Sequence, residues 1–140
     1  EFLVLTLTPR EKITSENTIN NILSLKYKIQ SLNWVHNVIT ILDIPLLDSS
    51  DEPLMDRIKN FRTLKDENID RDRGFQEILN SPVFKNFVIS EDAKTTGIIV
   101  NIKEKETDHH TQSSIEEVSI LLRQMNYIVI LLHFVQKESL

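Results

Sequence analysis

The strongest constraint on this fold is a pair of apolar strands separated by one amphipathic helix at the start of the chain. Residues 2–8 place three leucines on one face of an expected strand. Thr14 or Ser15 can cap the helix that follows, whose apolar residues recur at helical spacing at Ile19, Ile22, Leu25, Ile29 and Leu32. The β-branched run of residues 35–42 predicts a second strand. Residues 2–43 therefore predict a βαβ unit with parallel strands and a right-handed crossover.

An insertion is expected at residues 44–82, where the regular pattern loosens. Two prolines bracket an acidic loop, and short helices are predicted at residues 54–61 and 70–79. The second of these helices begins among charges of both signs: Lys65, Asp66, Glu67, Asp70, Arg71, Asp72 and Arg73. Paired carboxylates there could serve acid–base catalysis, but the alternating signs favour a solvated helix start with mutual salt bridges.

A β-hairpin and a helical segment are predicted for the rest of the chain. Residues 87–90 and 95–103 are strand candidates that form a hairpin within residues 86–103. From residue 115 to residue 135 apolar side chains recur at helical spacing, which predicts a long helix or a helical hairpin over residues 112–137. Its second half is apolar on nearly every side, so it requires cover on more than one face.

This order of elements predicts one α+β domain over residues 1–140. The expected architecture is a ferredoxin-like, split βαβ sheet with helices on one face, the insertion after the second strand, and the long C-terminal helix or helical hairpin. This plan lacks its last strand. An exposed sheet edge follows, through which two copies of the chain could pair as a homo-oligomer.

Composition and charge exclude several classes of function. The 140 residues suit a single domain. With 16 Lys and Arg against 21 Asp and Glu, the net charge of −5 would repel a phosphate backbone, so nucleic acid is not expected as a partner. The chain has no cysteine, which excludes disulfides and thiolate zinc sites. Its longest apolar stretch, residues 127–135, is too short to span a bilayer. The start within a strand, without an initiator Met, indicates a piece excised from a larger protein.

The candidates for chemistry all have simpler interpretations. The local cluster with metal-ligand chemistry consists of Glu106, Asp108, His109 and His110, but consecutive histidines in an extended linker point apart. His36 in a predicted strand and His133 in a predicted helix have no partner at a defined spacing, so structural roles are expected. Trp34 is expected to be exposed, as a cap over the helix end or as a contact residue.

No catalytic motif accompanies these residues. The chain lacks GxSxG, GxGxxG and HExxH motifs, and its two glycines cannot build a loop that cradles phosphate. We therefore expect no enzymatic activity and no catalytic, cofactor-binding or metal site, and the sequence identifies no substrate-binding residue.

Several blocks of sequence, taken in order, resemble a known family. They are residues 2–9, 14–17, 32–35, 38–45, 63–66, 77–82 and 88–103. Together they resemble the first extracytoplasmic loop of resistance-nodulation-division (RND) exporters. They are most similar to the hydrophobe/amphiphile efflux branch with the mycobacterial-membrane-protein-large-like and hopanoid-type lipid exporters. The sequence departs from the family at two turns, where Asn33 and Trp34 replace Pro-Gly and Ala93 replaces Gly.

The resemblance implies a periplasmic, porter-type domain of a proton-driven exporter in the bacterial inner membrane. Such a domain forms part of the pathway for hydrophobic or amphiphilic cargo, such as lipids and drugs, and carries no proton-coupling chemistry. Its partners would be the remainder of the transporter and the pseudo-symmetric second periplasmic domain. The alternatives are a free-standing ferredoxin-like domain that binds a ligand or regulates another protein, and a small enzyme on the same scaffold.

Overall fold

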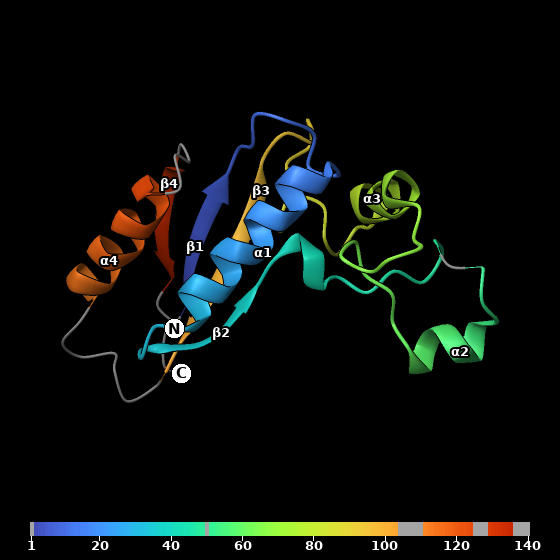
Figure 1. Cartoon of the computed structure of the whole chain (residues 1–140), viewed down its shortest axis with the longest axis horizontal. Helices are drawn as coiled ribbons and strands as arrows, with labels where there is room; N and C mark the ends of the chain where they lie inside the picture. The colour runs from blue at the N-terminus through green and yellow to red at the C-terminus, as the bar shows by residue number, and fades with distance from the viewer. Residues whose placement is uncertain (1, 50, 104–110, 125–128, 136–140) are drawn as a thin grey trace.

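The computed structural model describes residues 2–49, 51–103, 111–124 and 129–135. Over these residues the chain forms an antiparallel sheet with helices beside it, and an insertion that extends away from the sheet (Figure 1). The elements are β1 (Phe2–Leu7), α1 (Glu16–Gln30), β2 (Val35–Ile39), η1 (Ile41–Asp43), α2 (Leu54–Lys59), α3 (Arg71–Asn80), β3 (Thr96–Ile102), α4 (Thr111–Gln124) and β4 (Val129–Val135). This is an α+β fold, as the sequence predicts.

Strand β1 lies inside the sheet. The described strands follow the order β2-β3-β1-β4, and each neighbouring pair is antiparallel. Phe2 of β1 pairs with Asn101 of β3 on one side and with Val135 of β4 on the other. The alternating leucines of β1 and the apolar face of α1 share one core, whose members include Leu3, Leu5, Leu7, Ile19, Ile22, Leu25 and Ile29. Burial of these side chains holds α1 against the sheet.

The residues predicted to form a βαβ unit contain a strand, a helix and a strand. Both β1 and β2 run antiparallel to β3, so they are parallel to each other and β3 separates them. Ser15 caps α1, since its hydroxyl accepts from the Thr18 N–H at 3.2 Å. β2 ends at Ile39, earlier than predicted, because Thr40 caps the short helix η1 that follows.

The predicted helical segment at residues 112–137 is wrong in its second half. α4 ends at Gln124, and β4 follows and pairs with β1. An apolar run with β-branched residues suits a buried strand as well as a buried helix, so periodicity alone does not separate the two. Pairing favours the strand because it satisfies the backbone groups of β1. His133 therefore lies in a strand, and β4 is a strand that the sequence did not predict.

The predicted β-hairpin at residues 86–103 has one regular strand. β3 accounts for its second half, whereas residues 87–90 make only local bridges, including one between Ile89 and Thr96. Asn86 and Ala93 adopt the left-handed backbone conformation, with φ of 62° and 59°. The pairing of residues 87–90 does not extend further, because β3 pairs with β2 from Ile99 onward and with β1 on its other side.

Trp34 is buried rather than exposed as expected. The residue keeps 8% of its accessible surface, and its indole Nε1 donates to the Glu117 carboxylate of α4 at 2.9 Å. Val118 and Leu122 of α4 belong to the same core as α1. Trp34 thus joins the α1–β2 connection to α4, because the ring supplies apolar area and the N–H finds a partner.

The insertion is fixed at its base by backbone pairing and by two matching caps. Leu46 N–H donates to the Arg62 carbonyl at 2.8 Å, and the two residues form an antiparallel bridge. In each cap an aspartate accepts from the backbone N–H and the hydroxyl of a threonine three residues earlier. The two caps are Thr40 with Asp43 and Thr63 with Asp66. In sequence, the cap at residues 40–43 lies just before the bridge and the cap at residues 63–66 lies just after it.

A glutamine side chain covers the outer edge of β2. Gln30 Nε2 donates to the His36 carbonyl at 3.0 Å, and Gln30 Oε1 accepts from the Val38 N–H at 2.8 Å. These two bonds imitate a neighbouring strand at the free edge of β2. Such cover opposes pairing with another chain, because unpaired edge groups are a template for association.

Replacing this glutamine tests the role of the covered edge. We expect Gln30→Ala to lower the free energy of unfolding by about 1 kcal/mol, because two part-exposed hydrogen bonds are lost. The variant should also self-associate more strongly than the wild type in a sedimentation-velocity concentration series. Lys28→Ala, at an exposed position of the same helix, is the matched control. If Gln30→Ala associated no more than this control, the protective role of Gln30 would be disproved.

Candidate functional site

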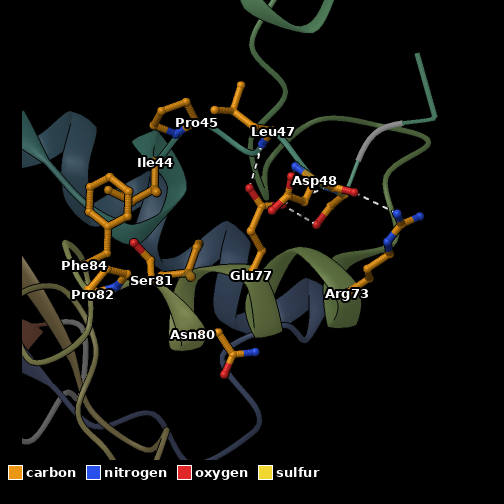
Figure 2. A pocket seen from close by; sticks show the side chains of 12 residues that line it. Ile44, Pro45, Leu47, Asp48, Arg73, Glu77, Asn80, Ser81, Pro82 and Phe84 are labelled. Atoms are coloured by element: carbon orange, nitrogen blue, oxygen red, sulfur yellow. Dashed lines mark hydrogen bonds between the residues drawn. The ribbon is translucent and has the colours of Figure 1, made fainter. Parts of the chain in front are cut away.

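A cavity of about 710 Å³ lies between α3 and the chain that leaves η1 (Figure 2). Its apolar lining consists of Ile44, Pro45, Leu47, Ile78, Pro82 and Phe84. Its polar lining consists of Asp48, Ser49, Arg73, Glu77, Asn80 and Ser81. This volume falls within the range of about 300–1,000 Å³ that is typical of small-molecule sites.

Close packing holds α3 against the loop of residues 44–49, which forms the other side of the cavity. Asp70 caps the helix, since its Oδ1 accepts from the Arg73 N–H at 3.0 Å. One residue later, Gly74 faces Leu46, and a Cβ at Gly74 would lie 2.7 Å from Leu46 Cδ1. A glycine here lets the helix approach the loop closely, and Glu77 follows almost one turn later.

The Glu77 carboxylate holds this loop against α3. Its Oε1 accepts from the Leu47 N–H at 2.6 Å, and its Oε2 accepts from the N–H groups of Asp48 at 3.1 Å and Ser49 at 2.8 Å. Oε2 also accepts from the Ser49 hydroxyl at 2.6 Å, and Figure 2 shows the side chain reaching up from the helix to the loop. An ionised carboxylate only accepts hydrogen bonds, so it suits a loop that presents several donors.

Two opposing effects act on the ionisation of Glu77. Partial burial raises the pKa of Glu77, whereas the hydrogen bonds from the Ser49 hydroxyl and from three backbone N–H groups lower it. The hydrogen bonds outweigh the burial, so the pKa of Glu77 lies below its ordinary value. Glu77 is therefore charged at neutral pH, and its contribution to stability is present above the pKa of the unfolded chain and lost as the pH falls through the lowered pKa.

The polar side of the cavity has an excess of negative charge. Arg73 points away from its centre, donating to the Asp48 carbonyl at 2.7 Å and pairing with the Asp51 carboxylate at 3.2 Å. The exposed Asp48 carboxylate forms no ion pair with a described residue. α3 carries no basic residue in its last turn, so nothing on the helix offsets the partial negative charge of its C-terminal end.

The charged group before α3 serves local structure and long-range ion pairs. Asp66 and Asp70 cap backbone N–H groups, and Asp72 accepts from the Thr14 hydroxyl at 2.9 Å. The expected mutual salt bridges are wrong. The basic residues instead pair outside the group, as Arg71 with Glu16, Arg73 with Asp51, and Lys65 with Asp43. These pairs tie the insertion to α1, to its own acidic loop and to η1.

The histidines do not build a metal centre where the structure describes them. In that part of the chain no group of three or more His, Asp or Glu side chains could hold a metal ion. His36 is exposed on β2, whereas Glu106, Asp108, His109 and His110 lie outside the described residues. The described helices also include none with the length and apolar character needed to cross a bilayer.

Sequence reasoning missed the cavity and Glu77. The hydrogen bond from Leu47 to Glu77 joins residues that are 30 positions apart, and no periodicity or motif links them. The relevant signal would be a run of loop donors that needs an acceptor, but any of the many acidic residues could supply one.

Comparison with known proteins adds no relative. No family model matches the chain, and searches of curated proteins and of solved structures find no significant match.

Neutralising Glu77 tests its hold on the loop. Glu77→Gln replaces one acceptor oxygen by an NH₂ donor that faces the loop N–H groups, so we expect a loss of about 1–3 kcal/mol in the free energy of unfolding at pH 7. The difference from the wild type should vanish at acidic pH, once Glu77 itself is protonated.

Urea unfolding over a pH series measures both effects. Glu67→Gln makes the same change at an exposed position, so it is the control and should behave as the wild type. A penalty for Glu77→Gln that persisted unchanged through the acid range would show that the charge of Glu77 is not what holds the loop.

Proposed function

We propose that this chain is a periplasmic domain of a proton-driven RND-type exporter of hydrophobic or amphiphilic molecules. In this role the domain lines part of the cargo pathway at the periplasmic face of the bacterial inner membrane. It packs against the remainder of the transporter and against a pseudo-symmetric second periplasmic domain. The domain itself performs no catalysis and no proton coupling.

The observation that carries this proposal is the conformation of Ala93. The exporter family usually has glycine at this turn, and Ala93 adopts φ of 59°, a conformation that favours glycine over other residues. The turn is closed by Ser90 and Asp92, whose side chains accept from the N–H groups of Thr95 at 3.0 Å and Lys94 at 3.1 Å. The backbone at this position therefore fits the family pattern although the side chain departs from it.

Two other blocks of the resemblance support the same assignment. The Thr40 and Asp43 cap lies in the block of residues 38–45, and the Thr63 and Asp66 cap makes up the block of residues 63–66. Both caps fix the base of the insertion. The residues that resemble the family are thus ones on which the turns and caps of this fold depend.

The strand order supports a finer description of the fold. We propose that the order β2-β3-β1-β4, with α1 after β1 and α4 before β4, is a ferredoxin-like, split βαβ arrangement. The insertion between β2 and β3 is the addition to that plan. Porter-type domains of the exporter family are expected to have such a core.

A second candidate function is a free-standing domain that binds a small ligand. The cavity between α3 and residues 44–49 favours it, because a hollow with an apolar wall and a polar side is typical of ligand sites. This candidate requires no membrane segments elsewhere in the protein.

The sequence and activity of the full-length protein distinguish the exporter domain from the free-standing ligand-binding domain. We expect apolar segments of about 20 residues on both sides of residues 1–140 in the full-length protein, as a membrane exporter requires. In bacteria that lack their main efflux systems, the full-length protein should lower the accumulation of the dye Nile red, and a protonophore should abolish the difference. A parent chain without such segments, or dye accumulation that never changes, would refute the exporter proposal.

A further inference from the structure

The cavity beside α3 has two chemically different sides. Ile44, Pro45 and Phe84 form an apolar wall at one end, as Figure 2 shows, and Leu47 extends it along the loop. The other end carries the carboxylates of Asp48 and Glu77. A ligand that fills this space would bury apolar surface on one side and meet negative charge on the other.

The negative side is not neutralised by the arginine in its lining. Arg73 is held at the rim by the Asp48 carbonyl and the Asp51 carboxylate, so its charge already has a partner. Glu77 is fixed by four donors, all of them uncharged, and therefore retains its charge. The C-terminal end of α3 adds partial negative charge at Asn80 and Ser81. A cation is favoured here and an anion is repelled.

We propose that this cavity binds a lipophilic organic cation, with its apolar part against Ile44, Pro45, Leu47 and Phe84 and its cationic group near Asp48 and Glu77. The volume of about 710 Å³ accommodates a ligand of drug size. A quaternary ammonium group suits these carboxylates, because it has no N–H donors and is therefore less strongly hydrated than the compact ammonium of lysine. The suggestion that the bound cation is transported cargo rests on the proposed exporter function. Binding of the cation by this domain does not depend on that function.

Matched probes of opposite charge test this binding. Decyltrimethylammonium and decyl sulfate have the same chain length, and each is titrated below its critical micelle concentration into the 140-residue protein. Two-dimensional ¹H–¹⁵N NMR follows the backbone amides. We expect saturable shifts from the cation at residues 44–49 and 77–84. The anion should bind there at least roughly tenfold more weakly, because its charge has the same sign as that of the site.

Variants separate the two sides of the site. Asp48→Asn should weaken cation binding about twofold to fivefold, the range expected for one exposed charge. Leu47→Asn should weaken binding of the cation by about threefold through lost apolar contact. The matched controls are Asp56→Asn and Leu54→Asn, which make the same changes at exposed positions of α2 outside the cavity.

Each outcome decides the inference. Cation shifts in the cavity that Asp48→Asn and Leu47→Asn weaken, and the controls do not, support it. Equal binding of both probes, shifts confined to the backbone amides of α2, or no saturable shifts would overturn it. These results do not depend on the parent protein, so a failed exporter assignment and a failed binding site are distinguished.

Discussion

The pairing of β1 on both of its sides is the interaction on which the rest of this structure depends. β3 and β4 both pair with β1. The first described strand therefore lies inside the sheet, next to the last described strand. α1 packs on the leucines of β1, and α4 is joined to the α1–β2 connection through Trp34. With β1 fixed, β3 is fixed as well, and β3 in turn sets the position of β2.

Much of the fold could be predicted because it is encoded by local patterns. The alternation in β1 and the helical spacing in α1 each involve neighbours in sequence, and α3 begins within one residue of its predicted start. β4 could not be predicted, since an apolar run such as Val129–Val135 satisfies two secondary structures and only a distant partner strand decides between them. The strand predicted at residues 87–90 is limited to isolated bridges, because β1 and β2 occupy the two edges of β3.

The candidate site was less predictable than the fold. Its geometry depends on one carboxylate that reaches a loop 30 positions earlier, and on a glycine that lets α3 approach Leu46. Neither contact has a spacing rule. The insertion shares the apolar core of the sheet through residues such as Leu46, Leu64 and Ile78, and side chain–backbone hydrogen bonds at its base add to this packing. The cavity lies within the insertion, between α3 and residues 44–49, so its position follows from tertiary packing. Its negative charge comes from Glu77, which the loop N–H groups hold in place, and from the exposed Asp48.

Amide hydrogen exchange in β1 tests most directly whether this strand is central. In an antiparallel sheet successive residues direct their N–H groups to opposite neighbours. With β3 and β4 both in place, the consecutive amides of Leu3, Val4 and Leu5 should all exchange slowly, at rates governed by opening of the sheet. Protection that alternates along these three residues, with every second amide exchanging rapidly, would show that one edge of β1 is unpaired and would contradict this account.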